Sequence, residues 1–281
     1  VDVKTDKSSY KNSEILKAGI TAVNLFGPPA ASRKTENELR ISRKPFTASG
    51  YDNYNFGITT PTDIYFENTI SEGLTDATGK VEQTFSLPGF TDIGLLTGRL
   101  FTTVFDETGR PVNRYTEIEI QTQQSFLGLG PVSGWVATNR PLSVNAIALN
   151  RAGKPVSARA RLEIIHIRWE TVLERNYGNT QYRSQRKEKV IMSKNFSIGT
   201  GGYAVQFSPP VSGEYEIRIS SETASNFVMQ SFYAYGWADA GMSSFQVNRE
   251  GEIGIETDKP LYKPGETAKL LFRTPFAGEL L

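Results

Sequence analysis

The sequence predicts an all-β protein made of β-sandwich modules in tandem, and three observations support this fold class. Short segments that alternate apolar and polar residues recur along the 281-residue chain, as they do in half-buried strands. Gly, Pro, Asn and Asp separate these segments at the spacing that is typical of sandwich strands. No long segment places its apolar residues at the 3.6-residue period of an amphipathic helix.

The clearest predicted strand covers residues 214–219. Tyr215, Ile217 and Ile219 fall on one face of it, because side chains alternate between the two faces of a sheet. We expect these three in a core, and the charged residues between them, Glu214 and Glu216 included, in solvent. Two further strands are expected at 116–120, with the same alternation, and at 161–167, whose mostly apolar run is typical of a central strand.

Two turns of one design connect predicted strands. Asp106–Val112 follows the apolar strand 100–105, and Asn150–Val156 follows the apolar strand 142–149. Each turn begins with an Asx residue that can bond to the backbone, continues with a Gly that accepts a positive φ, and ends with a Pro that stiffens the next strand. Two copies of so specific a turn indicate related modules.

A repeat spans the whole chain. Thr5–Glu14 aligns with Thr257–Glu266, and six of the ten positions are identical. Self-similarity of this kind indicates a modular array. The second copy predicts a strand, a Pro-Gly turn and a further strand at 267–272. The first copy lacks the Pro-Gly pair, so we expect a looser turn there.

The repeat and the predicted strands divide the chain into three parts. We expect one sandwich at residues 1–121, a second at 122–247, and the opening strands of an incomplete third at 248–281. The first two exceed a minimal sandwich, so each should carry insertions. The candidates are 33–45 and 50–57 in the first module and 175–189 in the second. We also expect both ends to be cut from a longer chain, and the third part to rely on added chain or another molecule to cover Ile253, Ile255, Leu270 and Phe272.

Composition excludes several classes of function. The 31 basic and 30 acidic residues nearly balance, which argues against a surface that binds duplex nucleic acid. The chain has no cysteine, so it has no thiol nucleophile, disulfide or Cys-ligated metal. No run of eighteen apolar residues is long enough to span a bilayer. His166, the single histidine, sits in an apolar strand and is expected in a core rather than as a catalytic base.

The remaining candidate residues also favour structural roles. The pairs Glu117/Glu119 and Glu214/Glu216 are expected to be solvated rather than to form a glycosidase dyad. We expect Trp169 or Trp237 to fill a core or a module interface. Tyr51, Tyr54 and Phe56 could form a sugar-stacking platform, but loop anchors are the simpler interpretation. Arg183, Arg186, Lys187 and Lys189, opposed by Glu188, favour a solvated hairpin face over a contact for an acidic partner. We therefore predict no catalytic, cofactor-binding or metal-binding residue and no cofactor.

Residues 257–267 resemble the opening strands of macroglobulin domains in the α2-macroglobulin and complement family. Three further segments resemble the bacterial branch of this family: 150–169, 209–217 and 232–237. The resemblance implies fibronectin-like or immunoglobulin-like sandwiches in a large protease trap. In such a trap, a target protease cuts a bait segment. In most members, a thioester from a Cys-Gly-Glu-Gln motif then attaches covalently to the protease. This chain has no cysteine for a thioester, and it should stop short of a complete bait domain.

The resemblance predicts a non-catalytic structural fragment of a large protease inhibitor. Its expected partners are neighbouring macroglobulin domains and, through the full-length parent, target proteases, with no nucleic acid. The expected location is extracytoplasmic, either periplasmic or at the cell surface, with a lipid anchor through the parent's N-terminus as one form. The alternative is a sandwich array from a cell-surface adhesin or transport-associated protein that binds glycan or protein.

Overall fold

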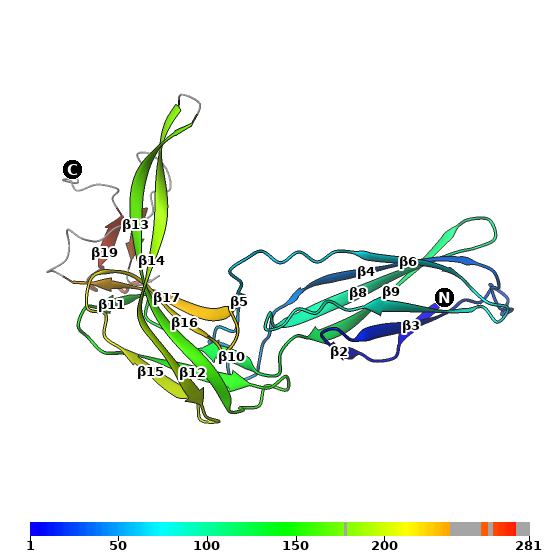
Figure 1. Ribbon diagram of the computed structural model, residues 1–281, viewed down its shortest axis with the longest axis horizontal. Helices are drawn as coiled ribbons and strands as arrows, with labels where there is room; N and C mark the ends of the chain where they lie inside the picture. Colours follow the sequence, from blue (N-terminus) through cyan, green and yellow to red (C-terminus); the bar gives the residue numbers. More distant parts are fainter. Residues whose placement is uncertain (177–178, 237–253, 258–260, 274–281) are drawn as a thin grey trace.

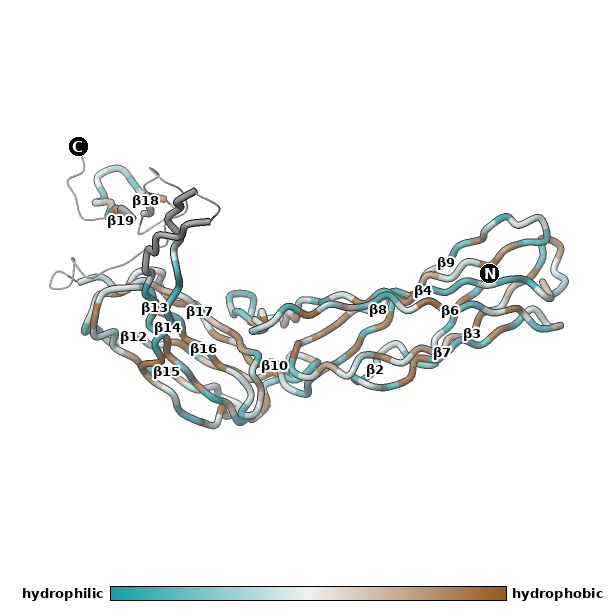
Figure 2. The backbone as a smooth tube through the Cα atoms, turned by 45° about the horizontal axis from the view of Figure 1, so that its top comes forward, coloured by the Kyte–Doolittle hydropathy of each residue, from teal (hydrophilic) through white to brown (hydrophobic). Residues whose placement is uncertain are grey.

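The computed structural model describes residues 1–176, 179–236, 254–257 and 261–273, with side chains except those of 170–183, 254–256 and 271–273. All the regular secondary-structure elements in the described residues are β-strands, so the all-β class is confirmed. Two sandwiches follow one another along a long molecule (Figure 1). Hydrophobic and hydrophilic residues alternate along many of the strands (Figure 2). None of the described residues forms a helix long and apolar enough to cross a membrane.

The first sandwich has sheets of three and five strands. The smaller sheet has the order β1 (Asp2–Thr5), β3 (Ile15–Thr21), β7 (Lys80–Ser86). The larger sheet has the order β2 (Ser9–Lys11), β9 (Pro111–Gln121), β8 (Leu95–Phe105), β4 (Lys34–Lys44), β6 (Thr69–Leu74). Tyr10, Leu16, Phe85, Leu100 and Ile120 are fully buried and belong to the core between these sheets.

The second sandwich pairs a three-stranded sheet with a larger one. The smaller sheet has the order β10 (Phe126–Leu129), β12 (Leu142–Leu149), β15 (Tyr203–Phe207). The larger one has the order β11 (Trp135–Ala137), β17 (Phe227–Tyr235), β16 (Gly213–Ser221), β13 (Ala158–Asn176), β14 (Asn179–Ile198). The short strand β5 (Ile58–Thr59), which precedes β6 in the chain, pairs with β17 of this larger sheet.

The core of the second sandwich matches the predicted strand register. Tyr215, Ile217 and Ile219 of β16 have no exposed surface, and they pack with Leu162 and Ile164 of β13. β13 is a central strand, because it pairs with β16 on one side and with β14 on the other. The hairpin of β13 and β14 runs well beyond the rest of the sandwich (Figure 1). The candidate insertion at 175–189 falls in this hairpin.

Residues 33–45 are not an insertion, and that prediction is wrong. They contain β4, which lies between β6 and β8 in the larger sheet of the first sandwich. Thr35 and Asn37 are buried at positions where an apolar residue is usual. Asn37 donates to the carbonyl of Ser71, and Thr35 donates to the carbonyl of Gly73. These hydrogen bonds allow polar side chains in the core, so the strand lacks an apolar alternation in its sequence.

The Asx turns form as predicted, and a third one was missed. Asp106 accepts hydrogen bonds from the backbone N–H groups of residues 108 and 110, and Asn150 accepts the same two bonds from residues 152 and 154. Gly109 and Gly153 adopt φ values of 83° and 75°. Asp76 makes the same pattern with residues 78 and 80. Its Asp-x-Thr-Gly sequence matches that of the Asp106 turn and could have revealed it.

The two copies of the end-to-end repeat share a turn. The backbone N–H of Lys11 donates to the Glu14 carboxylate at 3.1 Å, and that of Lys263 donates to the Glu266 carboxylate at 3.1 Å. Ser13 takes a φ of 62°, where the second copy has Gly265 at 88°. The first turn keeps this side-chain hydrogen bond. Its backbone bond from the Glu14 N–H to the Lys11 carbonyl is longer, at 3.4 Å, than the 3.1 Å from Glu266 to Lys263, which is the direction expected for a looser turn.

The tail forms a hairpin of β18 (Gly254–Thr257) and β19 (Leu270–Arg273). β19 begins three residues later than the predicted strand at 267–272. Leu270 is half exposed, whereas Ile253 and the side chains of Ile255 and Phe272 lie outside the described part. The Lys269 ammonium lies 5.2 Å from the ring centre of Tyr235 in β17, so the tail contacts the second sandwich. What covers the apolar face of the tail stays a prediction.

We expect Ile217→Ala to lower the free energy of unfolding of the second sandwich by about 2–5 kcal/mol, because the side chain is fully buried and its removal leaves a cavity. Chemical denaturation would measure this loss. Val190→Ala, at a half-exposed position of the same sheet, is the control and should change stability by less than about 0.5 kcal/mol. Equal losses in the two variants would contradict the register described above.

Candidate functional site at the junction of the two sandwiches

The most elaborate contact in the described part joins the two sandwiches through one loop. After β4, residues 45–57 cross to the second sandwich and continue into β5. Phe46 of this loop stacks on Phe126 of β10, with ring centres 4.0 Å apart and an angle of 4° between the rings. Phe56 meets Phe46 edge to face at 5.1 Å. All three rings are almost completely buried, together with Leu95 and Leu149. The loop therefore builds a small apolar core between the modules.

Backbone and side-chain hydrogen bonds fix the same loop to two strands of the second sandwich. The N–H of Asn55 donates to the carbonyl of Leu129 at 2.8 Å, and the N–H of Leu129 donates back at 3.0 Å. The Asn55 side-chain amide donates to the carbonyl of Met229 in β17 at 2.8 Å. β5 then extends the edge of β17 as an antiparallel strand. The first module thus supplies a strand to a sheet of the second.

The close approach of the loop requires a glycine in β10. A Cβ atom at Gly128 would lie 2.4 Å from a ring carbon of Phe56, well inside contact distance. Glycine in a strand often marks such an approach by another chain segment. A side chain at position 128 would therefore push Phe56 out of the aromatic cluster.

An ion pair closes one side of the junction. The Arg151 guanidinium, in the turn after β12, donates to both oxygens of the Glu119 carboxylate in β9 at 2.5 and 2.6 Å. The Lys44 ammonium lies 2.8 Å from the same carboxylate. The Glu119 side chain is only 13% exposed. The Arg151 hydrogen bonds, with Lys44, lower the pKa of Glu119 to about 2. The prediction that Glu119 is solvated like Glu117 is therefore wrong.

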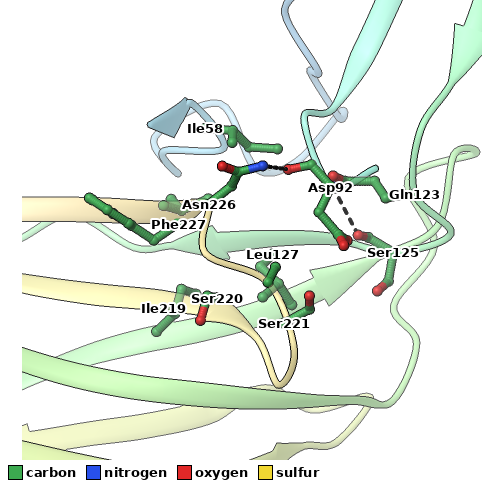
Figure 3. Close-up of a pocket in the computed structure, with 12 residues that line it drawn as sticks. Ile58, Asp92, Gln123, Ser125, Leu127, Ile219, Ser220, Ser221, Asn226 and Phe227 are labelled. Carbon is green, nitrogen blue, oxygen red and sulfur yellow. Dashed lines mark hydrogen bonds between the residues drawn. The ribbon is translucent and has the colours of Figure 1, made fainter. Parts of the chain in front are cut away.

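A second polar contact joins the loops beside β8 and β17. The Asn226 side-chain amide donates to the carbonyl of Asp92 at 3.1 Å, and the Gln123 amide in the linker donates to the carbonyl of Ser125 at 3.0 Å (Figure 3). The cavity between them measures about 20 Å³. This volume fits about one water molecule, so the cavity is too small to bind a metabolite.

The aromatic loop that the sequence singled out lies in this junction. Phe56 is part of the buried cluster, and Tyr51 and Tyr54 are half-buried beside it, 5.4 Å apart. Asp52 and Asn53 are exposed. Since the rings face protein, they anchor the loop and do not offer a free stacking surface for a sugar.

His166 is buried in the second sandwich, as expected. Its ring stacks on Tyr215 with centres 4.7 Å apart, and burial lowers the pKa of the imidazole. The Tyr215 hydroxyl donates to the carbonyl of Val211. Among the described residues, no group of three or more His, Asp or Glu side chains is arranged to hold a metal ion.

The outer face of the larger sheet differs from the prediction. Trp169 is half-buried, and its indole N–H donates to the Glu214 carboxylate at 2.9 Å. It lies five residues after the buried Ile164 on β13. Because side chains alternate between the two faces of a strand, Trp169 lies on the face of the sheet opposite to the core. Trp169 is therefore not a core residue, whereas Trp237 lies outside the described residues. Glu216 was expected in solvent but is 5% exposed.

Arginine side chains cover Glu216. Arg186 and Arg218 each contact its carboxylate at 2.5 Å, and both also pair with Glu188. Arg186 therefore belongs to a network across β14 and β16 instead of a solvated basic face. Lys187 and Lys189 are exposed as predicted, whereas the side chain of Arg183 lies outside the described part. Pairing with these arginines explains why Glu216 is buried. The alternation of apolar and polar residues in the strand could not predict this burial.

Two family models match this chain. The bacterial α2-macroglobulin MG5 domain matches residues 1–121, and the bacterial macroglobulin domain 6 matches residues 123–237. An α2-macroglobulin homolog of Nostoc is 23% identical over 99% of the chain, and the α2-macroglobulin of Pasteurella multocida is 24% identical over 94%. The chain spans 15% and 14% of these two relatives.

Solved structures show a related fold. The native form of Escherichia coli α2-macroglobulin matches 99% of this chain with a TM-score of 0.57 and 17% identity, over 18% of its own length. The form activated by porcine elastase matches 91% with a TM-score of 0.60 and 15% identity, over 22% of its length. At these identities the likeness supports the fold alone.

We expect Glu119→Gln to lower the free energy of unfolding by about 1–2 kcal/mol at neutral pH, since the substitution removes a partly buried ion pair between the modules. The folded-state pKa is depressed, so the contribution of Glu119 is present above its ordinary value of 4.5 and is lost as the pH falls toward about 2. Denaturation of both proteins across this range would show the two stability curves converging in acid.

Glu117→Gln is the matched control, because Glu117 pairs with Arg99 at the exposed surface two residues earlier on β9. It should have a smaller effect at neutral pH. A Glu119→Gln difference that did not change between pH 5 and pH 2 would contradict the assigned ion pair.

Proposed function

Because the chain belongs to the bacterial α2-macroglobulin family, we propose that it is a rigid, non-catalytic spacer within a protease inhibitor of this family. The junction carries this proposal. A loop of the first sandwich contributes three kinds of contact to the second: buried aromatic rings, paired backbone groups and an added strand. Such a joint resists bending, because the sandwiches could not move apart without exposing apolar rings and breaking buried hydrogen bonds.

A rigid spacer suits a trap that must hold distant parts in a defined arrangement. The chain spans only about one seventh of the relatives that it matches, so neighbouring macroglobulin domains are its proposed direct partners. Target proteases are proposed partners of the whole protein. Two solved E. coli relatives are described as activated by porcine elastase and by trypsin, which makes these enzymes suitable probes. We place the protein outside the cytoplasm, in the periplasm or at the cell surface.

Spin labels on the two sandwiches would test the rigidity. The chain has no native cysteine, so Thr84→Cys in β7 and Ser197→Cys in β14, both at exposed positions, allow selective labelling. We expect one narrow distance distribution from pulsed electron resonance. Gly128→Val should broaden it, because a side chain there displaces Phe56. Gly134→Val, at a site with open space around it, is the control and should leave the distribution narrow. A broad distribution in the parent protein would overturn the spacer role.

A protease assay tests whether this chain alone can inhibit a protease or whether inhibition needs the whole protein. We expect the 281-residue chain alone to give no protection of a large protein substrate against trypsin or elastase, because steric trapping needs a far larger enclosure. A small peptide substrate is the control, since a trap leaves it accessible whereas an active-site inhibitor does not. Protection of the large substrate by this chain would contradict the proposed role as a spacer.

A further inference from the structure

The turn that follows β3 exposes two large apolar side chains at the end of the first sandwich remote from the second (Figure 1). Leu25 is 93% exposed and Phe26 is 92% exposed, the highest values for large hydrophobic residues in the described part of the chain. The N–H of Gly27 donates to the carbonyl of Asn24 at 3.0 Å, and the N–H of Asn24 donates to the carbonyl of Pro28 at 2.9 Å. Two backbone hydrogen bonds therefore hold both side chains at the tip of a defined turn.

The geometry of this turn does not call for apolar residues. The same two backbone hydrogen bonds close the turns that begin at Asp76, Asp106 and Asn150. The two middle positions of those turns hold Ala-Thr, Glu-Thr and Arg-Ala, which are polar or small, as is usual at a turn tip. The turn at Asn24 holds Leu and Phe in the same two positions. Its apolar tip therefore needs another explanation, which a binding role supplies.

One turn of this design already joins two sandwiches. Arg151, the second residue of the Asn150 turn, binds Glu119 across the junction. Leu25 is the second residue of the Asn24 turn, so it has the equivalent place at the other end of the first sandwich. A turn of this design can thus bring its second residue against a neighbouring module. At the Asn24 turn the contact would be apolar instead of ionic.

The charges beside the Asn24 turn favour a protein partner over an anionic membrane. The two cations that follow the turn in the chain are both paired: Arg33 contacts Glu107 at 3.1 Å, and Lys34 contacts Glu36 at 2.7 Å and Glu72 at 3.3 Å. An apolar tip that binds an anionic membrane gains from free Lys and Arg side chains beside it. Cations that already have acidic partners supply little of this attraction.

The size of the tip favours a partner in the same polypeptide. Even with Leu25 counted as an aromatic ring, the two side chains offer only about 300–500 Å². A stable complex of separate molecules buries about 800 Å² on each partner. A module linked by the same chain needs less contact area, because linkage raises its effective concentration. The relatives are about seven times as long as this chain, so a whole protein of this kind has other modules to supply the contact.

We propose that the Asn24 turn docks on another macroglobulin domain of the same polypeptide, with Leu25 and Phe26 buried against an apolar surface of that domain. This inference rests on the proposed role of the chain as a spacer within a larger protein. The first sandwich is then fixed at both ends, by residues 45–57 at the junction and by the Asn24 turn at the opposite end. Burial of both side chains removes their apolar surface from water, which drives the docking.

Photo-crosslinking in the full-length protein tests the proposal. Phe26→p-benzoylphenylalanine keeps an apolar ring at the tip, and irradiation links this ring to whatever touches it. We expect an intramolecular link, identified by mass spectrometry, to a macroglobulin domain outside residues 1–281. Ala152→p-benzoylphenylalanine, at the equivalent exposed position of the Asn150 turn, is the matched control and should give no such link. A link to a second copy, to lipid or only within residues 1–281, or a yield no higher than that of the control, would overturn the proposal.

Thiol labelling is a second measurement, and it leaves Phe26 in place. The 281-residue chain has no cysteine, so Leu25→Cys supplies one reactive site. We expect maleimide to label this site about tenfold more slowly in the full-length protein than in the 281-residue chain, because a docked tip must open before it reacts. Mass spectrometry of the labelled peptide gives both rates. Ala152→Cys should react at the same rate in both proteins, whereas equal rates for Leu25→Cys would contradict docking.

Neither measurement depends on protease inhibition or on the stiffness of the junction. A missing cross-link together with a narrow spin-label distance distribution would overturn the docking alone and leave the spacer role standing. A broad distance distribution together with the expected cross-link would overturn the spacer role and leave the contact at the Asn24 turn standing.

Discussion

The insertion of one loop into a neighbouring sandwich is the constraint on which the arrangement of this chain depends. Residues 45–57 leave the end of β4, place Phe46 on Phe126 and then add β5 to the edge of β17. The backbone pairing at Asn55 and the aromatic stack are held by the same short segment, so displacing that segment would disturb both. The two sandwiches therefore share a core, although each has a larger core of its own.

Local sequence patterns predicted the strands that have an apolar face. The strands at 116–120 and 214–219 were found by their alternation and the strand at 161–167 by its apolar run, because apolar side chains mark a buried face directly. β4 was missed because Thr35 and Asn37 occupy core positions in it. The Thr35 hydroxyl and the Asn37 amide group donate hydrogen bonds in the interior, and hydropathy does not record hydrogen bonds. The same limit applies to Glu216, whose burial depends on two arginines in other parts of the chain.

The junction was the part that the sequence could least predict. Its contacts join residues far apart in the chain, such as Asn55 and Met229, and no local pattern relates such residues. Two local signs did exist. The aromatic run at Tyr51, Tyr54 and Phe56 was interpreted as a loop anchor, and the structure places it in the junction. Gly128 stands within a short apolar strand, which is a known sign of close approach by another segment. Neither sign identifies the partner, whereas the ion pair of Glu119 and Arg151 has no sequence signal at all.

The same loop also determines what separation of the modules would cost. Phe46 and Phe56 belong to the first sandwich and Phe126 to the second, and all three rings are almost completely buried. Separation would expose apolar rings from both sandwiches to water and break the backbone pairing of Asn55 with Leu129. Neither module can replace these contacts alone, since each supplies only part of the aromatic cluster. The stiffness of the joint thus depends on the loop and on β10 together.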